Sequence, residues 1–299
     1  MTVAAAFGLA ASLSVVVLGD ESGYTLTDNQ KMKLAAIEAA WHTEPAPAGI
    51  TLFGLPDVGT HSTRYAVQVP WVLGLIATRS LDKEVTGISE LVLKAQERIG
   101  SGMLAYRAVQ IIKHDPQNQA ARQVLALHGR DLGYALLLKR YGADPYAATE
   151  QQVRLAAWDT VPDVPLLFWS FRIMAALGIC FIGLFATAFL LCSLRQMEHR
   201  WFLLIAVAAI PLPWIAAELG WVIAEMGRQP WAIDGVLPTA LASSTLSRGQ
   251  LWTTIIGFTL VYGSLAVIEL GLIVRTIRHG PYGRHDAPLP TLPAIPAAA

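Results

Sequence analysis

The sequence predicts an all-α membrane protein: a polytopic helical bundle with about four spans and a long, mostly helical region outside the membrane. Two observations support this prediction. The 299 residues are 54% hydrophobic and 15% charged, with a mean hydropathy of +0.46, whereas about a quarter of the residues in a soluble domain are charged. Four separate stretches are also apolar enough to cross a bilayer, which takes about 20 helical residues. The formal net charge of zero gives no general argument for a nucleic-acid partner.

The four apolar stretches cover residues 3–18, 166–194, 201–226 and 251–274. The last three are long enough to span a membrane, whereas the first is short and begins almost at Met1. A signal peptide has basic residues before its apolar core, but the first basic residue here is Lys31. We therefore expect residues 1–18 to form a partial transmembrane helix.

A long polar region, residues 19–165, separates the first two apolar stretches and holds most of the charged residues. It is too long to be a loop without structure of its own. Hydrophobic periodicity and capping residues predict four helices in it, and a weak alternation predicts a short strand at residues 65–69. The expected helices cover residues 28–41 with Asp28 as the cap, 82–114, 117–141 and 147–158.

The rest of the chain is expected to form a three-span membrane region, residues 166–282, and a disordered Pro/Ala-rich tail, residues 283–299. Arginines in short loops mark the cytoplasmic side of a membrane protein. Their distribution favours a cytoplasmic C-terminus and places residues 19–165 in the periplasm or exterior. The arginines on the cytoplasmic side are Arg195, Arg200, Arg275, Arg278 and Arg284, against Arg228 and Arg248 on the other side.

The third apolar stretch contains two carboxylates, Glu218 and Glu225. Ionisable groups inside a span are costly and usually face the bundle interior or a functional site. Helical spacing places both carboxylates on one stripe with Trp214, Trp221 and Arg228, and Arg228 is close enough to Glu225 to hold it ionised. An ionised carboxylate can ligate a metal or accept a proton. A structural ion pair between helices is the alternative.

Other residues in the apolar stretches have simpler interpretations. Glu269 is either a buried hydrogen-bond anchor or part of a proton path. Met174 is explained by packing on periodicity alone, and Cys180 and Cys192 suit packing or lipid contact better than a disulfide or metal site. No histidine lies in any of these stretches, so the chain by itself offers no buried imidazole for a haem or a metal.

Lys33 and Glu38 lie on the helix predicted at residues 28–41. Their spacing corresponds to about 140° around a helix, so they are not natural partners on one face. By themselves they are explained by a solvated helix face. The sequence contains no P-loop, no Gly-x-Ser-x-Gly elbow, no Cys-x-x-Cys and no His-Glu-x-x-His motif.

Several short motifs are more specific. In the first half of the chain they are GDESGY at 19–24, QKMKLAAIE at 30–38, PAPA at 45–48, TLFG at 51–54, DLGY at 131–134 and LLKRY at 137–141. In the second half they are FRIM at 171–174, PLPW at 211–214, GRQPWAI at 227–233 and LPT at 237–239. Together they resemble subunit I of the cytochrome bd quinol oxidases, over nearly the whole chain to about Tyr282.

The resemblance implies a helical membrane bundle whose long periplasmic loop, the Q-loop, binds quinol, and residues 19–165 resemble its extended version. It implies that ubiquinol or menaquinol is oxidised at this loop. Electrons would then pass through a low-spin haem b, a high-spin haem b and a haem d or b, and reduce oxygen to water. A second protein, oxidase subunit II, would complete the complex in the bacterial inner membrane.

The resemblance also assigns roles to residues of this chain. Lys33 and Glu38 would serve quinol binding and oxidation. Met174 would be an axial ligand of the low-spin haem b, and Glu225 would ligate the high-spin haem b. The two arginines of the same motifs, Arg172 and Arg228, would lie near haem propionates or other charge and support it.

Subunits of this family are longer than the present chain, which resembles their C-terminal part. We therefore expect this chain to work with an N-terminal half that supplies the remaining haem ligands, and to be inactive as an oxidase without it. A non-catalytic quinone-binding or assembly membrane protein derived from such a subunit is the alternative. An inert gene relic is a third interpretation.

Overall fold

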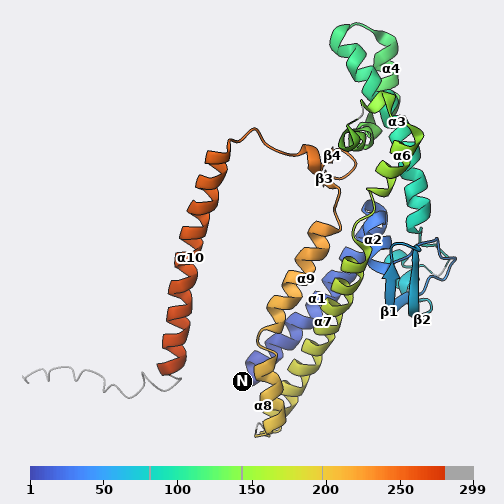
Figure 1. Cartoon of the computed structure of the whole chain (residues 1–299). Helices are drawn as coiled ribbons and strands as arrows, with labels where there is room; N and C mark the ends of the chain where they lie inside the picture. The colour runs from blue at the N-terminus through green and yellow to red at the C-terminus, as the bar shows by residue number, and fades with distance from the viewer. Residues whose placement is uncertain (81, 143, 197, 280–299) are drawn as a thin grey trace, which may run out of the picture. The chain divides into compact units, whose positions relative to one another are not determined.

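The computed structural model describes residues 1–279 apart from 81, 143 and 197, and it divides into two units, Met1–Ser243 and Ser244–Ala299 (Figure 1). The predicted tail, residues 283–299, lies outside the described residues. Four helices are long and apolar enough to cross a membrane, which confirms the predicted bundle of about four spans. They are Thr2–Thr27, Val164–Ser193, Arg200–Met226 and Arg248–His279.

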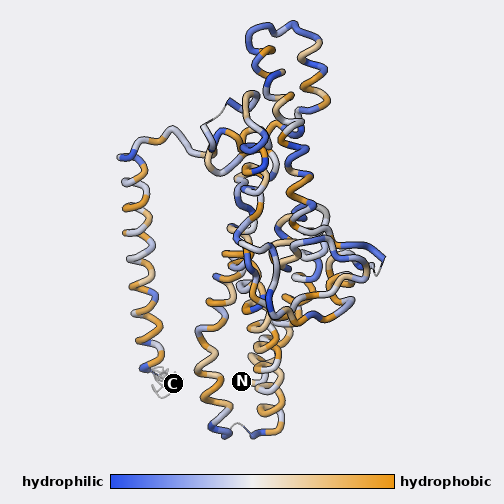
Figure 2. Tube along the Cα trace, turned by 45° about the vertical axis from the view of Figure 1, so that its right-hand side comes forward, coloured by the Kyte–Doolittle hydropathy of each residue, from blue (hydrophilic) through white to orange (hydrophobic). Residues whose placement is uncertain are grey.

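Three of these spans belong to the first unit, where helix α7 (Val164–Ser193) packs against both α1 (Thr2–Asn29) and α9 (Leu212–Met226). The span that ends in α9 begins with α8 (Arg200–Ala208). Pro211 lies between these two helices, and because proline has no N–H to donate, it interrupts the helical hydrogen bonds there. Figure 2 shows that hydrophobic residues dominate these helices, whereas the rest of the unit is mixed.

The first helix is longer than the predicted partial span at residues 1–18, because α1 continues through Asp20 and Glu21 to Asn29. The backbone of a helix satisfies its own hydrogen bonds, so the end of an apolar run does not by itself end the helix. Here Arg79 pairs with both Asp20 and Glu21, and this pairing stabilises the polar end of α1.

The predicted helix at residues 28–41 is divided differently in the structure. Asp28 lies inside α1, and the chain turns at Gln30, whose φ of −135° and ψ of 59° are not helical. A second helix, α2 (Lys31–Glu38), follows and ends at Ala39, which has a left-handed backbone conformation. The site residues of the motif at 30–38 therefore lie on a short helix of their own.

The other predicted helices of the polar region are present with shorter bounds. The prediction at 82–114 corresponds to α3 (Ile88–His114), and the prediction at 147–158 to α6 (Glu150–Trp158), which begins with a capping box between Thr149 and Gln152. The single helix predicted at 117–141 is interrupted at Gly129. It consists of α4 (Gln119–His128), the 3₁₀ turn η2 (Gly129–Asp131), α5 (Leu132–Leu136) and the 3₁₀ turn η3 (Leu137–Tyr141).

Two small antiparallel sheets accompany the helices. The strand predicted at 65–69 is part of β2 (Ser62–Val69), which pairs with β1 (Ile50–Asp57), a strand that the periodicity did not predict. The pairing has irregularities on both sides of Phe53, so the side chains of β1 do not alternate regularly. The π-helical turn η1 (Gly74–Thr78) follows β2. The second sheet pairs β3 (Trp231–Ile233) with β4 (Leu237–Pro238), and the turn η5 (Thr239–Leu241) follows.

The hydrophobic core of the first unit lies where the polar region meets the start of α7. Helices α2, α3 and α6 contribute to it together with the first turns of α7. The largest completely buried apolar side chains are Phe168, Ile88, Ile99, Leu138, Leu167 and Val164. This core fixes α2 against a membrane-spanning helix. The second unit contains α10 (Arg248–His279), on which Glu269 is exposed.

Candidate functional site

The short helix α2 carries Lys33 and Glu38 into different surroundings, as their spacing predicts. Lys33 is half-buried and lines a polar cavity. Glu38 is only 5% exposed and lies against α7. Within one short helix, Lys33 therefore faces the cavity and Glu38 faces α7.

Glu38 forms a buried ion pair with Arg172 of α7. The Nη2 atom of Arg172 donates to Oε2 of Glu38 at 2.9 Å, and Nη1 donates to the carbonyl oxygen of Ile37 at 2.6 Å. The Nε and Nη2 atoms also donate to the carbonyl oxygen of Thr51 in β1, at 2.9 and 2.5 Å. The guanidinium carbon lies 3.5 Å from the ring centre of Phe168. Arg172 therefore fastens both α2 and β1 to the membrane helix.

Arg172 was expected near haem propionates or other charge, and the charged group that it contacts in the structure is the Glu38 carboxylate. A position near haem propionates stays a prediction. In the structure its three guanidinium nitrogens donate to a carboxylate and to backbone carbonyls of this chain. Burial raises the pKa of the Glu38 carboxyl above the ordinary 4.5, and the charge and hydrogen bond of Arg172 oppose this rise. A carboxylate whose pKa is raised toward neutrality is a better general base than an exposed one.

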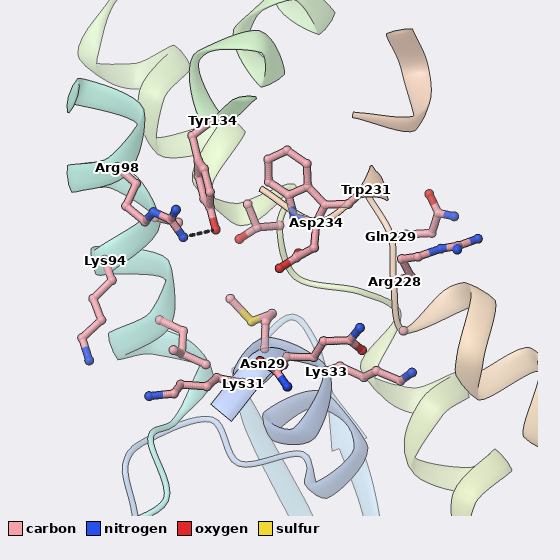
Figure 3. Close-up of a pocket in the computed structure, with 16 residues that line it drawn as sticks. Asn29, Lys31, Lys33, Lys94, Arg98, Tyr134, Arg228, Gln229, Trp231 and Asp234 are labelled. Carbon is pink, nitrogen blue, oxygen red and sulfur yellow. Dashed lines mark hydrogen bonds between the residues drawn. The ribbon is translucent and has the colours of Figure 1, made fainter. Parts of the chain in front are cut away.

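The cavity beside Lys33 has a volume of about 320 Å³ and is lined by cationic side chains from several elements (Figure 3). Lys31 and Lys33 come from α2, Lys94 and Arg98 from α3, and Arg228 from the segment after α9. Burial lowers the pKa of the Lys33 ammonium, and the positive charge of Arg228 lowers it further, whereas Glu225 opposes the shift. The cavity thus favours ligands with oxygen acceptors.

Two aromatic rings and a carboxyl group form another wall of the cavity. The rings of Tyr134 and Trp231 lie 4.9 Å apart, and Asp234 points into the cavity beside them (Figure 3). Arg98 donates to the Tyr134 hydroxyl at 2.9 Å and to Asp131 at 2.7 Å. Burial raises the pKa of Asp234, and the positive charge of Arg98 opposes this. The cavity therefore combines cations, flat apolar surface and one carboxyl group.

The sequence reasoning assigned no role to this aromatic wall. Tyr134 and Trp231 both lie in motifs that carried the family resemblance, DLGY and GRQPWAI. Membership of these motifs was the one feature of the sequence that could have marked them as site residues. The two segments meet because Gly133 has no side chain, and a Cβ atom there would collide with the carbonyl oxygen of Gly235. Such long-range contact between two segments cannot be read from the spacing of residues within either one.

The stripe predicted on the third span is present on α9, and the expected pairing of Glu225 with Arg228 is confirmed by an ion pair. The pair joins residues of one helix end rather than two helices. Glu218, Trp214 and Trp221 are exposed, so this face of α9 is not covered by the other helices of the first unit. As expected, no described histidine lies within α1, α7, α8 or α9, whereas His279 is the last residue of α10.

A sequence model described as cytochrome bd terminal oxidase subunit I matches residues 1–281. The chain belongs to this family. It is 38% identical to the cytochrome bd-II ubiquinol oxidase subunit 1 of Escherichia coli (strain K12), over 92% of this chain and 54% of that protein. It is 27% identical to the cytochrome bd ubiquinol oxidase subunit 1 of Bacillus subtilis (strain 168), over 96% of this chain and 50% of that protein.

The fold is similar to that of a solved bd oxidase from Geobacillus thermodenitrificans, with a TM-score of 0.57 and 24% identity over 91% of this chain and 48% of that one. The chain spans about half the length of the curated relatives it matches. Membership of the cytochrome bd subunit I family agrees with the four candidate spans and with the long region between the first two.

For a member of this family, Met174 and Glu225 are the residues to test as haem ligands. Met174 is half-buried on α7 and faces Gly220 of α9, where a Cβ atom would lie 3.3 Å from its sulfur. Thioether sulfur and carboxylate oxygen are both found as iron ligands. The chemistry of these donor types fits iron coordination.

The ion pair of Arg172 with Glu38 leads to a first testable result. Replacing Arg172 with glutamine leaves the buried carboxylate without its charge partner, which typically costs about 3–5 kcal/mol of stability. Loss of this cation also raises the pKa of Glu38 further. A carboxyl group whose pKa is higher in the folded protein than in the unfolded chain lowers the free energy of unfolding as the pH rises. The loss of stability in Arg172→Gln should therefore grow as the pH rises above 4.5, the ordinary pKa of a glutamate. Thermal unfolding in lipid nanodiscs over a range of pH measures this.

A matched control for this experiment is Arg64→Gln. Arg64 forms an ion pair with Asp57, but its side chain is 62% exposed, so its removal should cost no more than about 1 kcal/mol. Equal losses for the two variants would contradict a special role for the buried pair.

Proposed function

We propose that this chain carries the quinol-oxidising region and two haem ligands of a bd-type quinol oxidase, a complex of the bacterial inner membrane that reduces oxygen to water. The observation that carries the proposal is the arrangement on α2. Within this one short helix, Lys33 lines a cavity next to the ends of α1 and α9, and Glu38 forms the buried pair with Arg172. The names of the curated relatives support the quinol substrate.

In this proposal Glu38 is the base that takes a proton from the quinol hydroxyl. Its raised pKa suits this task, because oxidation of a quinol releases protons as well as electrons. Since Glu38 is buried beneath β1, either a water molecule bridges it to the quinol or β1 moves aside. Arg172 positions the carboxylate through its hydrogen bond.

Lys33 is proposed to bind a quinol oxygen inside the cavity. The Lys33 side chain is half-buried, and its ammonium group can donate up to three hydrogen bonds. The Tyr134–Trp231 wall offers a flat surface of the size of an aromatic ring. Ubiquinol and menaquinol share the two hydroxyl groups that this arrangement addresses.

Bound haems would carry the electrons from quinol to oxygen. Met174 is proposed to hold the low-spin haem b, Glu225 the high-spin haem b, and Arg228 to position Glu225 through their ion pair. The remaining haem ligands, including those of the haem d or b, would come from an N-terminal half of the subunit, and oxidase subunit II would complete the assembly. The arginine distribution supports a periplasmic position for the region that contains α2.

Replacing Lys33 with methionine tests the proposed quinol site. A hydrogen bond to a charged group contributes about 1.5–3 kcal/mol, so the KM for quinol should rise about 10- to 100-fold. The measurement is quinol-dependent oxygen consumption by the complete oxidase complex, alongside oxidation of an artificial donor that bypasses the quinol site.

The matched control is Lys139→Met, since Lys139 is outside the cavity beside Lys33 and lies near the Tyr106 ring. A KM unchanged by Lys33→Met would reject the site. A complex that binds quinone but never consumes oxygen would favour the non-catalytic alternative.

A further inference from the structure

Exposed apolar side chains gather on the β1–β2 hairpin and the turn η1. Leu52, Val67, Trp71 and Leu75 are 54%, 56%, 59% and 54% exposed, and Ile76 is 39% exposed. Contiguous apolar surface of this kind marks a contact with a partner or a membrane. None of these residues belongs to the four spanning helices, so the contact is additional to those spans.

The charges around these residues follow a pattern. No Asp, Glu, Lys or Arg occurs in residues 45–56 or in residues 65–78. The flanking positions are charged, with Asp57 and Arg64 near the hairpin tip and Arg79 after η1. Apolar runs of about 10–14 residues are too short to span a bilayer and are typical of core, re-entrant or interfacial segments. Because these side chains are exposed, a core position does not explain them.

Contacts with α7 give the depth of the hairpin in the membrane. The charge-free run Ile173–Leu194 has the length, about 20 residues, that the hydrocarbon core requires. Arg172, the residue before it, therefore lies at the boundary of the hydrocarbon. Since Arg172 donates to the carbonyl oxygen of Thr51, the start of β1 lies at that boundary too.

Three contacts in sequence order show which end of the hairpin is deeper. Thr51 contacts Arg172, the ring of Phe53 lies 5.3 Å from that of Trp169, and the ring of His61 lies 4.3 Å from that of Trp158. The partners move back along α7 and out of the span as the chain approaches the hairpin tip. The open end of the hairpin, where Ile50 pairs with Val69, is therefore the part that lies deepest in the membrane. Figure 1 shows the hairpin alongside α7 rather than beyond its end.

A second attachment gives the same depth independently. The first helix is free of charge from residue 2 to residue 19, and its next residues, Asp20 and Glu21, pair with Arg79 at 3.5 and 2.5 Å. Thr27 of α1 also donates to the carbonyl oxygen of Ala77 in η1 at 2.5 Å. The turn η1 thus lies beside residues 20–27 of α1, which directly follow its charge-free part and therefore begin at the hydrocarbon boundary.

We propose that the open end of the β1–β2 hairpin and the turn η1 are embedded in the interfacial layer of the bilayer that α1 and α7 cross, with lipid covering Leu52, Val67, Trp71, Leu75 and Ile76. Val17 and Leu18, near the end of the charge-free part of α1, are also exposed, at 70% and 67%. The proposal does not depend on the quinol assignment.

Trp71 suits this position in two ways. Tryptophan is enriched at membrane interfaces, because its ring is apolar and its N–H can remain hydrated. The backbone φ of Trp71 is 69°, a left-handed conformation that is unfavourable for a bulky residue and needs compensating contacts. Contact of its exposed indole with lipid supplies them.

Spin-label accessibility tests the proposal directly. Cysteines replace Leu52 and Leu75 one at a time in a chain whose Cys180 and Cys192 are changed to alanine, and each is labelled with a nitroxide in the full protein in nanodiscs. Relative to a control label, Leu52→Cys and Leu75→Cys should show a several-fold higher ratio of collisions with oxygen to collisions with a water-soluble nickel chelate. Oxygen concentrates in lipid, whereas the chelate stays in water.

The control is Leu127→Cys on α4, an exposed leucine far from the spanning helices of its unit (Figure 1). If the labels at 52 and 75 collide with the nickel chelate as often as the label at 127, the hairpin lies in water and the proposal is wrong. If both labels are shielded from oxygen and chelate alike, another protein covers the surface, which also overturns it. All three substituted leucines are exposed, so misfolding is not expected to confuse the result.

Discussion

Replacing Glu38 with glutamine is expected to lower the rate of quinol oxidation by about 10²- to 10⁴-fold, the usual contribution of a positioned general base. Glutamine has nearly the same shape and keeps an oxygen that can accept the hydrogen bond from Arg172. The change therefore removes the proton acceptor and preserves most of the packing around it. The measurement is quinol-dependent oxygen uptake by the assembled complex, compared with the oxidation of an artificial donor that does not use this site.

The pH profile gives a second readout of the same variant. A base must be ionised to accept a proton, so kcat/KM should fall as the pH decreases through the pKa of Glu38. Burial raises that pKa above 4.5, which places the acid limb at a higher pH than for an ordinary glutamate, and the limb should disappear in Glu38→Gln.

The control for Glu38 is Glu97→Gln, which changes an exposed glutamate of α3 and should leave both activities intact. An unchanged quinol rate in Glu38→Gln would reject the base. Equal loss with quinol and with the artificial donor would show that the variant is misfolded or that electron transfer beyond the quinol site has failed.

Replacing Met174 with leucine is expected to abolish the optical signal of the low-spin haem b in the assembled complex, because leucine cannot ligate iron. The side chains have similar volumes, and such a swap usually costs less than about 1.5 kcal/mol of stability. The protein should therefore still be present in the membrane. A reduced-minus-oxidised difference spectrum, normalised to the amount of protein, measures the effect.

Met103→Leu is a matched control, since Met103 and Met174 are both half-buried and both pack against the same core. This variant should keep the full haem signal. A normal low-spin spectrum in Met174→Leu would rule out the ligand, and loss of signal in both variants would indicate a packing defect.

Helix geometry alone predicted much of the candidate site. The spacing of Glu225 and Arg228 predicted their ion pair, and the wider spacing of Lys33 and Glu38 predicted that they would not share a face. These relations involve residues within one helix or directly after its end, where local backbone geometry determines which side chains meet. The short motifs also indicated the family, because they are spread over nearly the whole chain and do not depend on one site.

The ion pair of Glu38 with Arg172 could not be predicted in this way. Helix α2 and α7 are separated by most of the polar region, and no periodicity relates them. Their contact depends on how the core around Phe168 packs and on the position of β1, whose irregular pairing concealed it from the sequence pattern. The sequence pattern therefore could not show that Glu38 is the charged partner of Arg172.

The amino-acid sequence by itself determined the membrane class, the four spans, the family and the intrahelical pairs, because composition and local spacing are sufficient for these. Only the tertiary structure decided that Arg98, Tyr134, Trp231 and Asp234 share a cavity with Lys33, and that Thr51 of the β1–β2 hairpin contacts Arg172 of α7. Both arrangements join segments far apart in the chain. Long-range packing, such as the close approach of Gly133 to Gly235, holds them together, and no local pattern encodes it.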